Sequence, residues 1–188
     1  MLDLKQTIIT NNKVTLIGMM GTGKSKFGRL VANYLNFNFY DVDTLIENKF
    51  KTTIKDLFIK YGEPFFRNIE EQTIKELIFK IKENDEKVII SLGGGAFDSK
   101  NTRELLLKYT NVIWLNTPIN ILVERVGSGS KRPMIKVNTR ESINKLLKKR
   151  TRFYSLSHFQ LNTHNLTQNQ VMEKIIDLIF SQNNKVKK

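Results

Sequence analysis

The sequence contains no cysteine, which excludes a disulfide framework and a thiolate metal site. It also lacks an uninterrupted apolar run of membrane-spanning length and the basic-then-apolar N-terminal layout of a secretion signal. We therefore expect a cytoplasmic protein with no membrane partner. No internal repeat, low-complexity segment or linker divides the chain, and 188 residues are enough for one domain with a sizeable core, so we expect a single domain over 1–188.

Acidic residues are few relative to basic ones, since 18 Asp and Glu against 31 Lys and Arg give a net charge of +13. Such an excess attracts polyanions, and both nucleic acid and a phosphate-rich nucleotide are candidates. Nine basic residues lie in 131–152 with a single acid, Glu141. A helix-turn-helix, a zinc finger and a stacking-aromatic motif are all missing. A nucleotide partner is favoured, and a nucleotide-dependent regulator that binds nucleic acid is the alternative.

What the sequence does contain is a complete phosphate-binding loop. Residues 18–25 read Gly-Met-Met-Gly-Thr-Gly-Lys-Ser, the G-x-x-x-x-G-K-S spacing, between an expected strand at 13–17 and an expected helix that ends near residue 35. Glycines let the backbone N–H groups turn inward around phosphate, and the helix adds the positive end of its dipole. We expect Lys24 to reach the β- and γ-phosphates and the Ser25 hydroxyl to hold Mg²⁺.

Strands and helices alternate along the rest of the chain. We expect further strands at 39–42, 87–91, 111–115 and 158–161, and helices at 53–61, 64–82, 102–109, 118–126, 141–152 and 171–180. This alternation predicts an α/β fold whose parallel sheet is covered on both faces. Ligands of such sheets bind at the carboxyl ends of the strands. The phosphate loop, an Asp-x-Asp pair, a triple glycine and a basic loop all fall at such ends.

The Asp-x-Asp pair consists of Asp41 and Asp43, at the end of the second expected strand. Strand alternation places residues i and i+2 on one face, so we expect both carboxylates to point into the same site. One carboxylate could hold Mg²⁺ through water while the other accepts a proton from a substrate hydroxyl or orients it. A solvated turn is the alternative interpretation of this pair.

Arginines and glycines supply the other candidates. Arg67 can grip a carboxylate bidentately, or it can simply pair with the nearby acids Glu63, Glu70 and Glu71. The glycines at 93–95 indicate close approach of a ligand to the backbone, or an unusual turn. Arg132, in the loop at 127–138, could close over the transferred phosphate and stabilise the charge of the transition state.

Together these residues resemble the shikimate kinase family, a nucleoside-monophosphate-kinase-like branch of the phosphate-loop proteins. The resemblance covers about 13–180 and rests on six motifs in the family's order: G-x-x-x-x-G-K-S (18–25), D-x-D (41–43), G-E-x-x-F-R (62–67), S-x-G-G-G (91–95), R-P (132–133) and R-x-x-x-Y (150–154). It implies a three-layer α/β/α fold with a five-stranded parallel sheet of order 2-3-1-4-5. It also implies a helical substrate-binding region at about 44–82 and a mobile lid at about 127–138. We expect a disordered, lysine-rich tail at 183–188.

The resemblance implies ATP-dependent phosphorylation of the 3-hydroxyl of shikimate, on the route to aromatic amino acids, with Mg²⁺ as cofactor. Shikimate and ATP are the implied partners, and we expect a monomer that does not bind nucleic acid. The implied catalytic residues are Lys24, Asp43 and Arg132. The implied ATP-binding residues are Gly21, Thr22, Gly23, Lys24, Ser25, Lys26, Arg125 and Arg132, with Arg125 packed on adenine. The implied shikimate-binding residues are Asp43, Arg67, Gly94, Gly95 and Arg150, and Mg²⁺ would be held by Ser25 and, through water, by Asp41.

A departure from the family and two rival classes bear on this interpretation. The segment at 163–170 lacks the proline that the family often carries there, which concerns the packing of adenine. A gluconate or nucleotide kinase would keep the phosphate loop and the lid, but would need neither the triple glycine nor the pair Arg67 and Arg150. A GTPase is disfavoured because the Asn-Lys-x-Asp guanine signature is missing.

Overall fold

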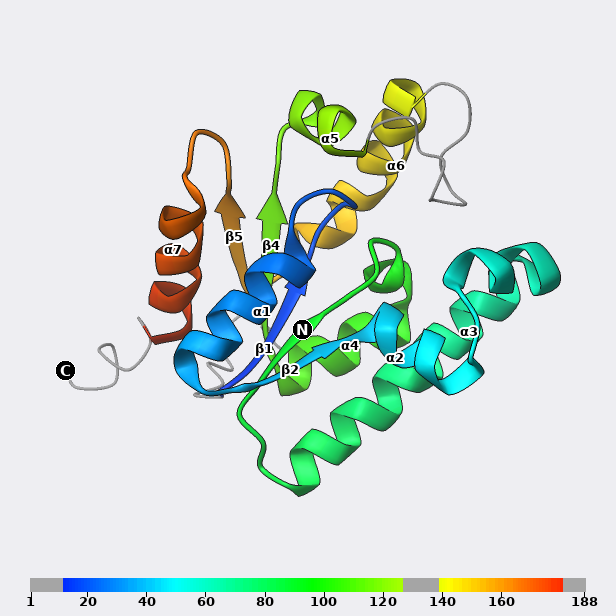
Figure 1. Ribbon diagram of the computed structural model, residues 1–188, viewed down its shortest axis with the longest axis horizontal. Coiled ribbons are helices and arrows are strands. Elements are labelled where there is room, and N and C mark those ends of the chain that lie inside the picture. The colour runs from blue at the N-terminus through cyan, green and yellow to red at the C-terminus, as the bar shows by residue number, and fades with distance from the viewer. Residues whose placement is uncertain (1–11, 127–138, 181–188) are drawn as a thin grey trace, which may run out of the picture.

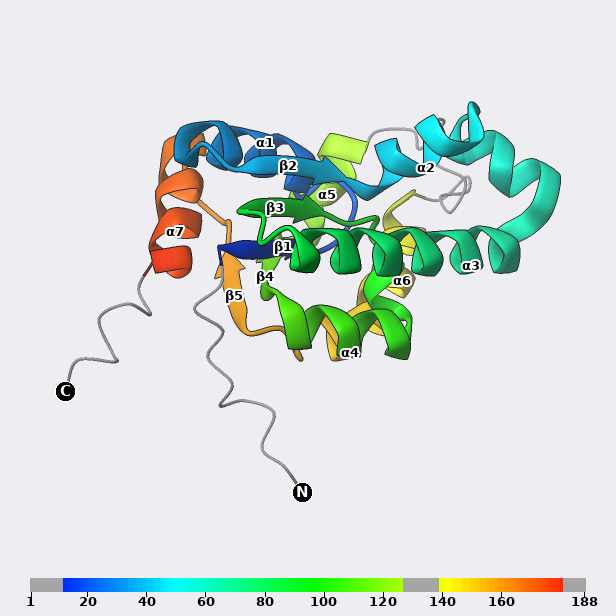
Figure 2. The same cartoon turned by 90° about the horizontal axis from the view of Figure 1, so that it is seen from below.

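A computed structural model describes residues 12–126 and 139–180 of the chain. In these residues five strands form one parallel sheet of order β2-β3-β1-β4-β5, which can be followed in Figures 1 and 2. The strands are β1 (Lys13–Ile17), β2 (Asn38–Asp41), β3 (Val88–Ser91), β4 (Asn111–Asn116) and β5 (Phe159–Asn162). The predicted α/β fold, the parallel sheet and its strand order are therefore confirmed.

Strand β1 lies at the centre of the sheet, between β3 and β4. All five of its residues are buried, as expected for a strand that is covered on both faces. Its side chains alternate between two cores: Val14 and Leu16 belong to one apolar cluster, and Ile17 belongs to the other. The phosphate loop follows directly, so the loop begins at the most enclosed strand end of the sheet.

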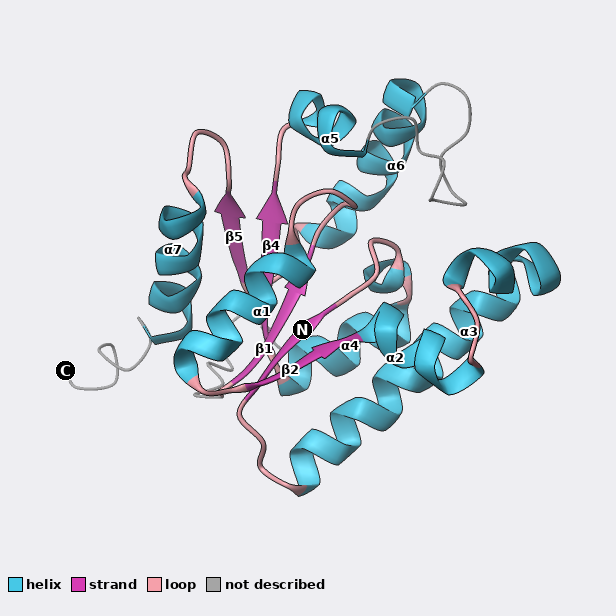
Figure 3. Ribbon diagram, viewed as in Figure 1, coloured by secondary structure: helices cyan, strands magenta, loops and turns pink. Residues whose placement is uncertain are grey.

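Helices cover both faces and complete the three layers (Figures 2 and 3). The helices are α1 (Lys24–Leu35), α2 (Val42–Phe50), α3 (Ile54–Glu83), α4 (Lys100–Tyr109), α5 (Ile119–Val126), α6 (Thr139–Tyr154) and α7 (Gln168–Phe180), with a 3₁₀ turn, η1 (Ala96–Asp98). Residues of α1 and α7 form one apolar cluster with the sheet, and residues of α2 to α6 form the other. No helix in the two described segments is both long and apolar enough to cross a bilayer.

The second strand ends one residue earlier than predicted, and this changes the place of Asp43. Asp41 is the last residue of β2 and the N-cap of α2, where its carboxylate accepts a hydrogen bond of 3.2 Å from the backbone N–H of Thr44. Asp43 lies in the first turn of α2. The prediction that strand alternation aligns the two carboxylates is therefore wrong, because a helix cap ends the strand between them.

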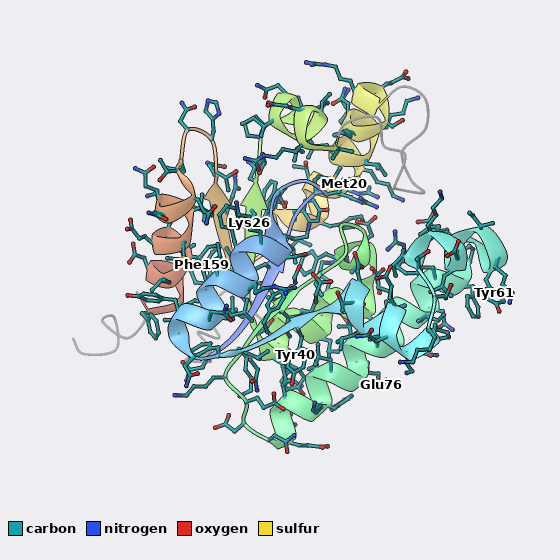
Figure 4. All side chains as sticks on the ribbon, in the orientation of Figure 1. Met20, Lys26, Tyr40, Tyr61, Glu76 and Phe159 are labelled. Carbon is teal, nitrogen blue, oxygen red and sulfur yellow. The ribbon has the colours of Figure 1, made fainter. Side chains whose placement is uncertain are left out.

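Helix α3 joins the two helices expected at 53–61 and 64–82. Gly62 adopts φ 80° and ψ 172°, which breaks the helix into two halves just before Pro64. The second half carries eight of the nine buried residues of α3, namely Phe66, Ile69, Glu70, Thr73, Ile74, Leu77, Ile78 and Ile81. The first half ends at Tyr61, which Figure 4 labels at the tip farthest from the sheet.

The predicted lid at 127–138, with Arg132, and the predicted disordered tail at 183–188 lie outside the described residues.

Candidate active site

The phosphate loop is held in shape by a glycine and by side chains that donate to its own carbonyl groups. Gly18 adopts φ 141°, and a Cβ on it would lie 2.6 Å from the carbonyl oxygen of Leu115, so only glycine fits against the neighbouring strand. The buried ammonium of Lys24 donates to the carbonyl oxygens of Gly18 and Met19 at 2.8 and 2.9 Å. The Thr22 hydroxyl donates to the Met19 carbonyl at 2.8 Å. The predicted loop is therefore folded around its lysine.

Residues in and around the phosphate loop differ in their exposure to solvent. Met20 is buried within the loop, whereas Lys26, at the start of α1, is exposed (Figure 4). The guanidinium of Arg125, on α5, is exposed and donates to the carbonyl oxygen of Gly21 at 3.3 Å. Arg125 thus lies against the loop, on the side where the resemblance places ATP.

Both predicted metal ligands neighbour Ser91, the last residue of β3. The Ser25 and Ser91 hydroxyl oxygens are 3.2 Å apart, and Asp41 pairs with Ser91 in the sheet register. Hydroxyl and carboxylate oxygens are the hard ligands that Mg²⁺ prefers. In the described parts of the chain, no group of three or more His, Cys, Asp or Glu side chains could hold a metal. Such a sparse donor set fits Mg²⁺ that also binds nucleotide phosphates, rather than a metal enclosed by protein ligands.

Two arginines meet at the glycines that follow β3. A Cβ on Gly95 would lie 2.8 Å from Nη2 of Arg150 and 2.6 Å from Cζ of Arg67, so both guanidinium groups approach this glycine. Arg67 comes from α3 and Arg150 comes from α6, 83 positions further along the chain. The predicted cation pair is therefore assembled, and the lack of a side chain at Gly95 makes room for it.

Two carboxylates lie at the other end of the same glycine turn. A Cβ on Gly93 would lie 2.7 Å from Oε1 of Glu70 and 2.9 Å from Oδ1 of Asp43. Asp43 is partly exposed, whereas Glu70 is buried. The three glycines thus separate an acidic end from a cationic end. Asp43 reaches the predicted site from a helix turn instead of a strand.

Each arginine also pairs with carboxylates of the protein. Arg67 donates through Nε to Glu63 at 3.2 Å and through Nη1 to Glu70 at 2.5 Å. Arg150 donates through Nε to Asp98 at 3.3 Å. The predicted pairing of Arg67 with its acidic neighbours is therefore confirmed for Glu63 and Glu70. Its predicted grip on a substrate carboxylate stays a prediction, and Arg67 approaches Gly95, where such a ligand would bind.

Glu70 is a site residue that sequence reasoning named only as one possible partner of Arg67. Burial raises the pKa of its carboxyl to about 7, against the lowering effect of the Arg67 guanidinium. The charge of Asp43 raises the pKa further. The spacing of Glu70 three residues after Arg67 was the available signal, since residues i and i+3 share a helix face. Sequence alone did not reveal that this face is buried.

A phosphate loop at the central strand end, facing an aspartate and two arginines across a glycine turn, is the arrangement of a phosphate-loop kinase with a small-molecule substrate. The family model described as shikimate kinase matches residues 20–180, and the chain belongs to this family. It is therefore a kinase that uses ATP, as the sequence predicted.

Individual relatives agree with this assignment. The chain is 38% identical over 164 residues to the shikimate kinase of Thermodesulfovibrio yellowstonii, with 87% of this chain and 92% of the relative covered. It is 34% identical over 166 residues to the shikimate kinase of a Sulfurihydrogenibium species, with coverages of 88% and 96%. The solved structure of shikimate kinase from Acinetobacter baumannii in complex with shikimate aligns with a TM-score of 0.84 at 32% identity, covering 91% of this chain and 94% of that one.

Proposed function

We propose that the protein transfers the γ-phosphoryl group of ATP to the 3-hydroxyl of shikimate, with Mg²⁺ as its cofactor. The observation that carries this proposal is the polarity of the glycine turn, with Arg67 and Arg150 at Gly95 and the carboxylate of Asp43 at Gly93. Shikimate is a small ring with a carboxylate on one side and hydroxyl groups on the other. A site with cations at one end and an aspartate at the other complements that shape.

Each residue has a role that follows from its position. The two guanidinium groups bind the shikimate carboxylate, together with the backbone N–H groups of Gly94 and Gly95. The ring hydroxyls then face Asp43, which orients the reacting hydroxyl and accepts its proton as the oxygen attacks the γ-phosphorus. The bond from the γ-phosphorus to the bridging oxygen breaks, and ADP leaves with that oxygen.

The phosphate loop supplies position and charge neutralisation. The Lys24 ammonium exchanges its contacts with the Gly18 and Met19 carbonyls for the β- and γ-phosphate oxygens when ATP binds. The Ser25 hydroxyl and, through water, Asp41 would hold Mg²⁺, which supplies neutralisation of the phosphate charge. Phosphoryl transfer depends mainly on such positioning and electrostatics, and these residues provide both.

The remaining assignments complete the proposal. Thr22, Gly23 and Lys26 contribute to ATP binding through the loop and the start of α1. Arg125 packs on adenine, and Arg132 closes on the ATP phosphates from a lid at 127–138. The protein acts as a monomeric, single-domain, cytoplasmic enzyme that does not bind nucleic acid.

Acceptor-dependent ADP release tests the proposal. Purified protein with ATP and Mg²⁺ is given shikimate, gluconate, a nucleoside monophosphate or no acceptor, and we expect turnover above background with shikimate alone. Phosphorus–proton coupling in the NMR spectrum of the product identifies the phosphorylated oxygen. Turnover with another acceptor would reassign Arg67 and Arg150. A protein that binds ATP but turns over no acceptor would favour the nucleotide-dependent regulator.

A further inference from the structure

Arg150 is a buried arginine whose two edges have different surroundings. Its side chain is 3% exposed. Its Nε edge faces Asp98, with 3.3 Å between Nε and Oδ2. Its tip faces the glycine turn, because Cβ atoms built on Gly94 and Gly95 would lie 3.4 Å from Nη1 and 2.8 Å from Nη2. The carboxylate of Asp98 therefore contacts the edge of the guanidinium that points away from the proposed ligand.

Asp98 is itself fixed to the glycine turn. Its backbone N–H donates to the carbonyl oxygen of Gly95 at 3.0 Å. Its own carbonyl oxygen accepts from Nη1 of Arg103 at 3.2 Å, and the same nitrogen donates to the carbonyl of Phe97 at 2.9 Å. The guanidinium of Arg103 lies over the ring of Phe153, on α6, at 4.7 Å. The Asp98 backbone is thus held on both sides, so its carboxylate has a defined position relative to Gly95.

The surroundings of the Asp98 carboxylate point to Arg150 as its main partner. Oδ2 accepts from Arg150, whereas Oδ1 is buried without a hydrogen-bond partner in the described structure. A partly buried carboxylate is retained at a cost in solvation unless a cation compensates it. The unsatisfied Oδ1 indicates that Asp98 is not placed to satisfy its own hydrogen bonds. Its contact through Oδ2 instead fixes the position of Arg150.

We propose that Asp98 is a positioning residue for substrate binding: its carboxylate holds Nε of Arg150 so that both Nη groups point at Gly94 and Gly95. This inference rests on the proposed function, in which Arg150 binds the shikimate carboxylate. An arginine fork is effective when its plane is set before the ligand arrives, since less side-chain entropy is then lost on binding. Asp98 supplies that preorganisation from the same turn that carries the backbone N–H donors.

Positioning and simple electrostatics predict opposite effects on shikimate binding. The negative charge of Asp98 repels a carboxylate ligand, so its removal alone would lower the KM for shikimate. Loss of positioning instead raises the KM for shikimate. The sign of the change therefore separates the two explanations without reference to its size.

The test compares Asp98→Ala and Asp98→Asn with the wild type in the ADP-release assay. We expect Asp98→Ala to raise the KM for shikimate by about tenfold or more, which corresponds to about 1.4 kcal/mol. The KM for ATP should change by less than about twofold. Asp98→Asn keeps a side-chain oxygen for Nε and the size of the residue, so it should fold and show a smaller rise. The matched control is Glu104→Gln. Glu104 is an exposed carboxylate on α4 that pairs with Lys100 at 3.7 Å, and its replacement should change neither KM.

A double-mutant cycle with Arg150→Ala decides whether Asp98 acts through the arginine. We expect Asp98→Ala to cause no further rise in the KM for shikimate once Arg150 is replaced. A rise of full size in that background would overturn the inference. If Arg150→Ala raises the KM for shikimate while Asp98→Ala and Asp98→Asn leave it unchanged or lower it, the inference fails and the proposed function stands. If Arg150→Ala itself has no effect, the proposed role of Arg150 fails and the inference fails with it.

Discussion

The substitution Gly95→Ala tests the geometry of the site directly. Gly95 has φ −103° and ψ −9°, a conformation open to alanine, so the backbone gives no reason for the variant to misfold. The new Cβ would lie 2.6 Å from Cζ of Arg67 and 2.8 Å from Nη2 of Arg150, closer than such atoms can approach. At least one guanidinium must therefore move away from the turn.

The size of the effect follows from the interaction that is lost. Arg150 is enclosed, whereas the side chain of Arg67 is 27% exposed and has room to swing outward. A displaced guanidinium gives up a charge-assisted hydrogen bond to the substrate carboxylate, worth about 1.5–3 kcal/mol. That range corresponds to a rise of about 10- to 150-fold in the KM for shikimate.

Steady-state kinetics with shikimate and with ATP as the varied substrate provide the assay. We expect the KM for shikimate to rise, the KM for ATP to stay near the wild-type value, and thermal denaturation to show a folded protein. A folded Gly95→Ala variant with wild-type KM for shikimate would show that the two arginines do not bind the substrate over this glycine. Equal rises in both KM values would indicate a general distortion of the site instead.

Three further substitutions probe the acidic end and the phosphate loop. Asp43→Asn should keep the fold and ATP binding but lower kcat by about 10²–10⁴-fold; a folded variant with wild-type kcat would remove Asp43 from proton transfer. Lys24→Ala should abolish ATP binding measured by calorimetry and also lower the melting temperature, because the loop loses its contacts to the Gly18 and Met19 carbonyls; unchanged ATP affinity would contradict the role of this lysine. Burial raises the pKa of Glu70 from 4.5 to about 7, so the folded state holds a proton that the unfolded state has lost, and stability falls as the pH rises through that window. Glu70→Gln should flatten this fall in denaturant unfolding at pH 5 and pH 8, and identical pH profiles for the two proteins would refute the raised pKa.

Much of the fold could be predicted because its signals are local. The loop spacing at 18–25 and the alternation of strands with helices predicted the parallel sheet. The family resemblance, which rests on six motifs, implied the order of its strands. The boundary at Asp41 shows where the pattern was ambiguous. A short Asp-Val-Asp run satisfies strand alternation, yet Asp41 is also a good N-cap, and its bond to the Thr44 N–H favours the helix. Asp43 lies against the glycine turn all the same, because α2 begins where β2 ends.

The carboxylates that pair with Arg67 and Arg150 could be predicted less well. A single sequence indicates only weakly which side chains are buried and which distant residues pair. Glu70 and Glu63 are both within four residues of Arg67, but only Glu70 is buried. Asp98 and Arg150 lie 52 positions apart on different elements, and no spacing rule joins them. Asp98 and Arg150 meet because α6 packs against η1, and the sequence does not indicate that contact.

The break in α3 has a consequence for how this chain tolerates changes in length. Nearly all buried residues of α3 follow Gly62, so Arg67 is registered against the core by the second half of the helix. A residue gained or lost in the first half, where Leu57 is the one buried residue, would shift that half and leave the register of Arg67 against the core unchanged. A residue gained or lost between Arg67 and Ile81 would rotate the guanidinium by roughly 100° about the helix axis, away from Gly95. The kink thus separates a part of the helix whose length affects mainly its own packing from a part whose length sets the position of Arg67.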